Sequence, residues 1–270
     1  MKNVFYVLAF SMMSIFCVSC NQEEEITVDD EVDTQSLSDE AEIEAISDEL
    51  FILSEIALDQ TQGKSAKAEC PSISQNIQQK SITLDFGSGC TGPYGVLEYK
   101  GKLIVTYEIE SGAITPRTIT TQDFSVNGNS VEGTLTASGF EESETGVYSY
   151  DLTYDLSLGF KDNSTYSQAA TYNVQWLEGF GDDDYTNDLI QSTGSLTGTN
   201  RKGDDYGSTI LTPLLRKTSC ASENSFVTVS GIKETQPARL GTYSINYGDG
   251  ACDKMVTITT PRRTYTLELP

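Results

Sequence analysis

Acidic side chains dominate the reactive groups of this chain, which has forty Asp and Glu residues and no histidine. Without histidine, Ser–His and Cys–His nucleophiles are absent and the commonest zinc ligand is missing, which disfavours most hydrolases but leaves open a carboxylate-pair enzyme such as a glycosidase. The densest acids are Asp182, Asp183 and Asp184, with Asp188 close behind. They could offer oxygen ligands to calcium but lack the spacing of a calcium-binding loop, so a solvated hairpin tip is the favoured interpretation. We expect no catalytic residue and no cofactor, and these four aspartates are the weak metal candidates.

The first nineteen residues are typical of a secretory signal peptide. Lys2 supplies a positive charge and Val4–Ile15 a largely apolar run, which is too short to span a bilayer. The predicted cleavage site precedes Cys20 and resembles the lipobox of bacterial lipoproteins, in which this cysteine is lipidated. Cys17 stands where leucine is commonest in that motif. The alternative is an ordinary secretory signal with an incidental cysteine.

An acidic run follows the predicted lipidation site. Glu23–Glu25 resembles the export signal of Bacteroidota-type lipoproteins, and its alternative reading is a solvated charged tether. The sequence therefore predicts a lipid-anchored protein of the outer membrane, exposed on the cell surface, with residues 20–38 as an acidic tether. The net charge of −23 makes nucleic acid an unfavourable partner, because phosphate would be repelled.

A single helix is predicted over residues 39–62. Ser38 is a candidate N-cap and Gly63 a candidate stop. Apolar residues recur at spacings of three and four, at Ile43, Ile46, Leu50, Leu53 and Ala57. This single stripe favours packing on the body of the domain over a coiled coil, which would need several sustained heptads.

From residue 80 onward the pattern changes to a period of two, which is typical of strands with one buried and one wetted face, and residues 68–270 are expected to form an all-β domain. The alternating runs are 103–109, 148–160, 166–176, 256–258 and 265–269. Asn127-Gly128 is the strongest hairpin signal, and Lys161-Asp162-Asn163 is a second turn. The expected fold is mainly β: an antiparallel meander forming a sandwich or open barrel, with one N-terminal α-helix.

Four cysteines remain once Cys17 is removed and Cys20 is lipidated. An even number in an exported protein predicts two disulfides, with three pairings allowed. The segment Thr83–Cys90 resembles Ser244–Cys252, since each is a short strand, a glycine-rich turn and a cysteine. This similarity favours Cys70–Cys90 and Cys220–Cys252, and suggests duplicated half-units over 70–110 and 220–269. Chance similarity between two strand–turn segments is the alternative.

The chain also resembles a group of uncharacterised Bacteroidota lipoproteins over residues 68–269. The shared features are the motif at Asp85–Cys90, the strand at Lys100–Val105 with its basic start, and Tyr247–Gly250 with the nearby Cys252-Asp253. No activity accompanies the resemblance, which implies architecture and location only.

We therefore expect a lipid-anchored cell-envelope protein with a non-catalytic binding or structural role. It would contact the membrane through its lipid, and a glycan or a protein would be its ligand. Two alternatives stay open: a carboxylate-dependent enzyme acting on surface glycans, and a calcium-stabilised adhesion module.

Overall fold

The structure is a computed structural model that describes residues 32–61, 63, 70–91, 97–109, 116–182, 184, 186–223 and 228–269. The predicted signal peptide, Cys20 and Glu23–Glu25 lie outside the described residues. No helix within the described part of the chain combines the length and apolar character needed to cross a membrane.

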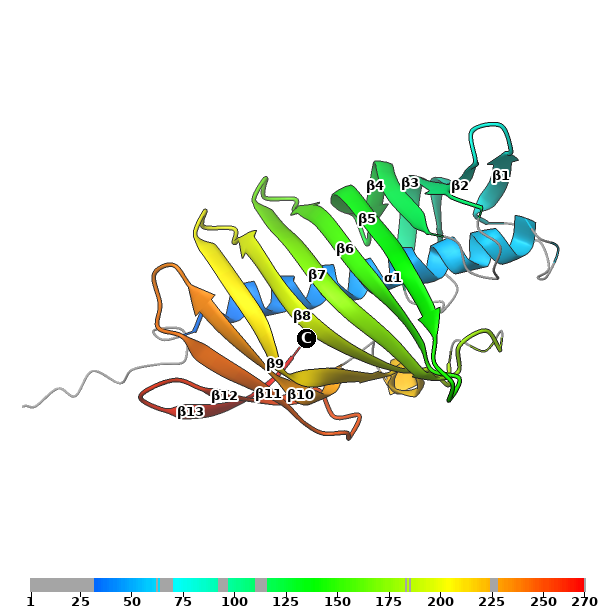
Figure 1. Ribbon diagram of the computed structural model, residues 1–270. Coiled ribbons are helices and arrows are strands. Elements are labelled where there is room, and N and C mark those ends of the chain that lie inside the picture. The colour runs from blue at the N-terminus through cyan, green and yellow to red at the C-terminus, as the bar shows by residue number, and fades with distance from the viewer. Residues whose placement is uncertain are drawn as a thin grey trace, which may run out of the picture.

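Thirteen strands form one antiparallel sheet in which every strand pairs with the next along the chain (Figure 1). The sheet is not closed, because β1 and β13 are its two edges. The predicted mainly β meander with one helix near the N-terminus is therefore confirmed. The strands are β1 (Ser72–Asn76), β2 (Ser81–Thr91), β3 (Glu98–Tyr107), β4 (Arg117–Val126), β5 (Asn129–Glu142), β6 (Tyr148–Gly159), β7 (Thr165–Glu178), β8 (Leu189–Thr199), β9 (Asp205–Lys217), β10 (Thr228–Pro237), β11 (Tyr243–Asp249), β12 (Met255–Thr259) and β13 (Thr264–Glu268).

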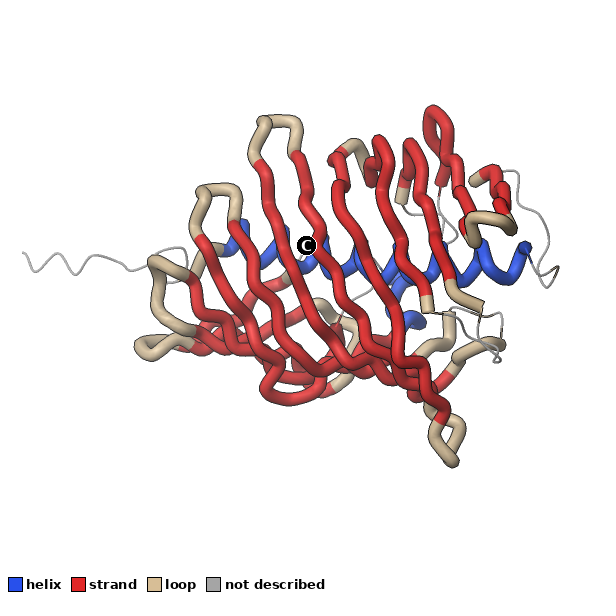
Figure 2. The backbone as a smooth tube through the Cα atoms, turned by 45° about the horizontal axis from the view of Figure 1, so that its top comes forward, coloured by secondary structure: helices blue, strands red, loops and turns tan. Residues whose placement is uncertain are grey.

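The sheet curls around the helix α1 (Thr34–Thr61), which runs across its inner face (Figures 1 and 2). Glycines allow neighbouring backbones to approach where the pairing register shifts. A Cβ on Gly194 would lie 2.1 Å from the carbonyl oxygen of Thr171, and one on Gly231 would lie 2.4 Å from that of Pro213. Both glycines have positive φ, so any other residue would be strained as well as crowded.

The alternating pattern places apolar side chains against the helix, as predicted. In β6 and β7 alternate residues are buried, and Trp176 packs with Phe51 of the helix and with Phe180. Asn127 and Gly128 both have positive φ and join β4 to β5, which matches the hairpin expected there. The strand predicted over residues 103–109 was too long at its end, because β3 ends at Tyr107 and Ile109 is exposed.

The helix begins at Thr34, five residues before the predicted start at Asp39. Asp33 provides the cap, because its Oδ1 accepts a hydrogen bond of 3.3 Å from the backbone N–H of Ser36. Ser38 is therefore helical and not the cap, and residues 34–38 do not belong to an extended tether. At the other end Gly63, with positive φ, donates its N–H to the carbonyl of Gln60.

The helix is buried on more than the predicted stripe. All five stripe residues are buried, but so are six consecutive residues, 49–54, which cover every face of a helix. Several of the buried residues are acids: Asp39, Glu40, Glu44 and Glu49. A one-sided apolar stripe is thus an incomplete description, because the curled sheet contacts this helix from several directions.

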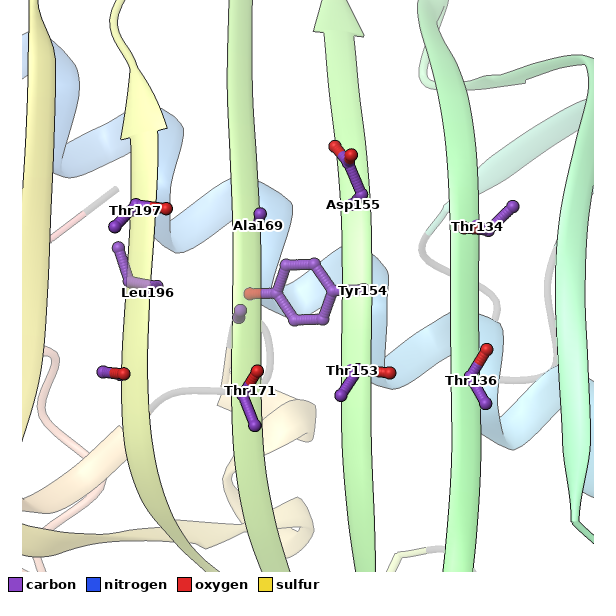
Figure 3. A pocket seen from close by; sticks show the side chains of 11 residues that line it. Thr134, Thr136, Thr153, Tyr154, Asp155, Ala169, Thr171, Leu196 and Thr197 are labelled. Atoms are coloured by element: carbon purple, nitrogen blue, oxygen red, sulfur yellow. The ribbon is translucent and has the colours of Figure 1, made fainter.

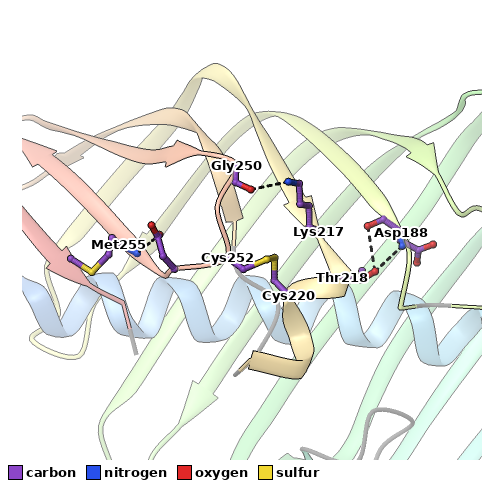
Figure 4. Close-up of a disulfide and its surroundings, with 8 residues drawn as sticks. Asp188, Lys217, Thr218, Cys220, Gly250, Cys252 and Met255 are labelled. Carbon is purple, nitrogen blue, oxygen red and sulfur yellow. Dashed lines mark hydrogen bonds between the residues drawn. A yellow bond between two sulfur atoms is a disulfide. The ribbon is translucent and has the colours of Figure 1, made fainter.

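The structure contains the two disulfides favoured by the sequence similarity, Cys70–Cys90 and Cys220–Cys252. Cys70–Cys90 joins the start of β1 to the end of β2. Cys220, in the short 3₁₀ helix Thr218–Glu223, meets Cys252 in the turn after β11 (Figure 4). The neighbouring Lys217 also donates to the carbonyl of Gly250, at 2.8 Å. The second disulfide therefore ties two connections at the same end of the sheet.

We predict that replacing both Cys220 and Cys252 with serine lowers the free energy of unfolding by about 3 kcal/mol, as expected for loops of this size. Amide hydrogen exchange should rise most in β10–β12 and least in β5–β7, because the lost constraint lies at the C-terminal end of the sheet. The Cys70→Ser/Cys90→Ser variant is the matched control and should show the reverse distribution. A uniform rise across the sheet in both variants would contradict this expectation.

Candidate binding site

Four basic side chains from the sheet region pair with acids of the helix. Three of these pairs are arginine–carboxylate contacts, namely Arg117–Glu55, Arg201–Asp39 and Arg216–Asp48. The fourth centres on Lys233 of β10, whose side chain is 2 % exposed. The main energetic effect of a buried ion pair is the cost of leaving one of its members without the other.

Lys233 lies between two carboxylates one helical turn apart. Its Nζ is 2.6 Å from Oε1 of Glu40 and 3.1 Å from Oε1 of Glu44. Burial alone would lower the pKa of Lys233, but the two carboxylates outweigh it and hold the pKa well above its usual value. Burial raises the pKa of Glu40, although Lys233 opposes the shift. The single ammonium group of Lys233 thus forms ion pairs with two carboxylates.

A layer of tyrosines and small polar groups surrounds this cluster. Tyr172 donates to Glu44 Oε1 at 3.0 Å, and Ser208 lies 3.5 Å from Glu40 Oε1. Tyr206 donates to Gln168, at 3.1 Å. Burial is the main reason that the pKa values of Tyr172 and Tyr206 lie above normal, so both hydroxyls are neutral donors.

A pocket of about 250 Å³ opens beside this cluster, at the N-terminal end of the helix. Glu40 and Tyr206 line its inner part. The β8–β9 and β10–β11 turns supply its outer wall. The lining residues are Asp33, Ser36, Glu40, Asn200, Lys202, Asp204, Tyr206, Thr235, Pro237, Arg239, Leu240 and Tyr243. We call this the helix-end pocket.

The charges of the helix-end pocket are matched in pairs. Lys202 Nζ is 2.9 Å from Asp33 Oδ2, and Arg239 Nε is 2.6 Å from Asp204 Oδ1. Partial burial would raise the pKa of Asp33, but Lys202 and the backbone N–H of Ser36 lower it overall. Because Glu40 is paired with Lys233, each carboxylate that lines the pocket has a cation beside it. The pocket therefore suits a polar ligand without net charge.

A second, shallower groove of about 400 Å³ lies on the sheet face that points away from the helix (Figure 3). Hydroxyl groups dominate it, and Thr136, Thr153, Thr171 and Ser195 are direct neighbours across four strands. Threonine is favoured on exposed strands for its β-propensity alone. The groove has one charged residue, Asp155, and one aromatic residue, Tyr154, in its lining, whereas the helix-end pocket has five charged and two aromatic residues. We therefore regard the helix-end pocket as the better candidate site.

The acidic segment between β7 and β8 is used for local turn bonds. Asp182 accepts from the N–H of Asp184 at 2.9 Å and from Asn187, and Asp184 accepts from Thr186. Asp188 is buried, and this burial raises its pKa to about 6. The indole of Trp176 opposes the shift, and the charges of Asp182 and Asp184 add to it. Asp183 lies outside the described residues. Among the residues that the structure describes, no three acidic or cysteine side chains gather around a metal position.

Sequence reasoning missed the residues of the helix-end pocket. None of Glu40, Glu44, Lys202, Lys233 and Arg239 was a candidate site residue in the sequence analysis. One signal was available: Lys233 lies at an inward position of its strand, in step with the buried residue Thr235. A lysine at such a position needs a buried acid, and helix acids spaced i, i+4 could provide it.

No family model matches this sequence, and no curated protein or solved structure matches it either. The resemblance to Bacteroidota lipoproteins accordingly stays a prediction.

Glu49 is a further acid of the helix that is buried. Its Oε1 accepts a hydrogen bond from the hydroxyl of Tyr99, and Oε2 has no hydrogen-bond partner among the residues that the structure describes. Burial raises the pKa of Glu49 to about 7, and the bond from Tyr99 opposes this shift only in part. The folded protein therefore binds a proton here more tightly than the unfolded chain does.

Because this folded-state pKa is raised, stability should fall as the pH rises from about 4.5 to about 7. We predict that Glu49→Gln removes the part of this dependence that Glu49 contributes, leaving the part from Asp188, and makes the protein more stable than wild type at pH 8, by up to about 3 kcal/mol. Urea unfolding at several pH values measures the difference. Glu132→Gln, at an exposed position on β5, is the control and should leave the profile unchanged. A wild-type profile that stays flat between these pH values would refute the assignment.

Proposed function

We propose that this chain is a lipid-anchored protein of the cell envelope that binds an uncharged, hydroxyl-rich ligand in the helix-end pocket. The sequence around Cys20 supports the anchor, and the acidic residues after it support display on the outer face of the outer membrane. The pocket supports the binding role, because aromatic walls and several polar groups converge there. This convergence is the observation that carries the proposal.

The chemistry of the pocket favours a sugar unit of a surface glycan. A volume of about 250 Å³ is below the range usual for drug-sized ligands and suits a single ring. Tyr206 and Tyr243 provide aromatic surface, while Asn200, Arg239 and the carboxylates provide donors and acceptors for hydroxyl groups. Since the carboxylates are already paired, a strongly charged ligand would have to break an ion pair to enter.

Binding without catalysis is favoured by the same pairing. A glycosidase needs one carboxyl group that gives a proton and a second that acts as base or nucleophile. Here Asp33 is paired with Lys202, and the carboxylate of Glu40, although burial raises its pKa, is engaged by Lys233 and Ser208. Neither group is arranged to exchange a proton with a ligand.

The anchor is tested by Cys20→Ala. We expect the wild-type protein to incorporate a fatty-acid analogue and to sediment with membranes, whereas the variant should do neither, because it lacks the acylated thiol. Cys17→Ala is the matched control and should be lipidated normally. Equal label in the Cys20→Ala variant and wild type would disprove the anchor.

The ligand site is tested by Leu240→Trp, which places a large ring in the wall of the pocket. We expect binding to a printed array of neutral and acidic bacterial-surface glycans to fall by about tenfold or more, because the indole would occupy the ring-sized space. Leu211→Trp, at an exposed position of β9, is the matched control and should bind like wild type. Neutral glycans should dominate the wild-type signal. Equal binding by the two tryptophan variants, or no wild-type binding to any neutral glycan, would exclude this pocket.

A further inference from the structure

The connections at the two ends of the sheet carry opposite charge. Because the sheet is a meander, alternate connections fall at the same end. At one end, which we call the tether end, lie the connections 160–164, 200–204, 238–242 and 260–263. Together they contain Lys161, Arg201, Lys202, Arg239, Arg262 and Arg263 against two acids, Asp162 and Asp204.

The opposite end, which we call the far end, is acidic. It includes the turn 77–80, the turn 143–147, the β7–β8 connection and the turn 250–254. The described acids of its connections are Glu108, Glu144, Asp182, Asp184, Asp188 and Asp253, against the bases Lys80 and Lys254. Although the chain as a whole is strongly negative, the connections at the tether end carry a net positive charge and those at the far end a net negative charge.

Most bases of the tether end are accessible to solvent. Lys161, Arg262 and Arg263 are exposed. Lys202 and Arg239 each pair with one acid, yet their side chains remain 67 % and 76 % exposed. Arg201 differs, because it is held by Asp39 and lies over the ring of Phe160.

The chain enters the fold at this same end. Asp33, immediately before the helix, contacts Lys202 and Asn200 of the β8–β9 turn. Figures 1 and 2 show that the helix starts on the side of the sheet formed by its later strands. Asp33 lies thirteen positions after Cys20, so an acyl chain on Cys20 would hold the tether end within about 45 Å of the membrane.

We propose that the tether end docks on the anionic lipid surface of the leaflet that holds the acyl chains, and that the far end points away. This orientation rests on the proposed lipidation of Cys20. Two of the docking turns also form the outer wall of the helix-end pocket, so a sugar bound there would belong to a glycan of the same membrane. Basic groups close to an anchor gain from anionic headgroups, and a lipid chain plus a basic patch is a recurrent two-signal membrane attachment. The acids of the far end would be repelled by the same surface.

The competing occupant of the tether end is the acidic stretch of the same chain that precedes the helix, Glu23–Glu31. It is close in sequence and opposite in charge. It would cover the basic turns whether or not an anionic surface is present. The two occupants therefore predict different results: only docking on lipid makes the accessibility of the tether-end lysines depend on lipid composition.

Lysine acetylation followed by mass spectrometry, applied to the full lipidated chain on vesicles, can distinguish the two occupants. On phosphatidylcholine vesicles containing phosphatidylglycerol, we expect labelling of Lys161 and Lys202 to fall roughly threefold or more relative to pure phosphatidylcholine. Labelling should recover in about 0.5 M salt, because screening removes the attraction. Lys80 and Lys254, at the far end, should label equally on both vesicles.

Charge reversal gives the matched variants. In Lys161→Glu/Arg262→Glu/Arg263→Glu, the remaining reporter Lys202 should lose its protection, whereas Lys80→Glu/Lys254→Glu should keep it. Protection that is equal on neutral and anionic vesicles would assign the tether end to the acidic stretch and overturn the proposal. Protection at the far end, or at neither end, would overturn it too. Failure of the protein to float with neutral vesicles would instead show that the lipid anchor is absent.

Discussion

The ammonium group of Lys233 lies deep in the protein between two carboxylates of the only α-helix that the structure describes. An isolated charge in that position would be strongly unfavourable, so the cluster is stable only while Glu40, Glu44 and Lys233 stay together. Removing one member of such a buried group typically costs about 3–5 kcal/mol. The position of the helix along the sheet is therefore fixed more sharply than apolar packing alone would fix it.

The other helix–sheet ion pairs extend the same constraint along the helix. Arg201 contacts the first turns, Arg216 the middle and Arg117 the later turns, through Asp39, Asp48 and Glu55 respectively. Apolar contacts are interchangeable when a helix slides or rotates in a groove, whereas ion pairs at intervals are not. The pairs thereby select one register of the helix against the sheet. The helix-end pocket depends on that register, because both Glu40 and Asp33 belong to its wall.

The fold class followed from the sequence because its determinants are local. Period-two burial and turn residues such as Asn127-Gly128 act over a few positions, and the meander needs only neighbouring strands to pair. The disulfide pairs also followed, from the similarity between the segments that end at Cys90 and Cys252. The helix start was missed because Ser38 is as good an N-cap as Asp33 on sequence grounds. Only the contacts of Asp33 with the β8–β9 turn distinguish the two.

The pocket could not be predicted, because it brings together positions far apart in the chain. Glu40 and Lys233 are separated by nearly two hundred residues, and each alone is an ordinary charged residue of a helix or a strand. Their burial follows from the curl of the sheet, which depends on register shifts near glycines such as Gly231. Periodicity reports which face of a strand is inward. It does not report how strongly a sheet of thirteen strands bends.

The helix joins the two functional elements that we propose, because it connects the anchored end of the chain to the pocket wall. Asp33 is at once the cap of the helix, the partner of Lys202 and a lining residue of the pocket. A force on the N-terminal chain would act first on this residue, and next on Asp39 and Glu40. The last of these is held by a buried ammonium, so the helix resists displacement where the pocket requires its shape. The buried ion pairs thus hold the shape of the site in a protein that we propose is anchored by its N-terminus.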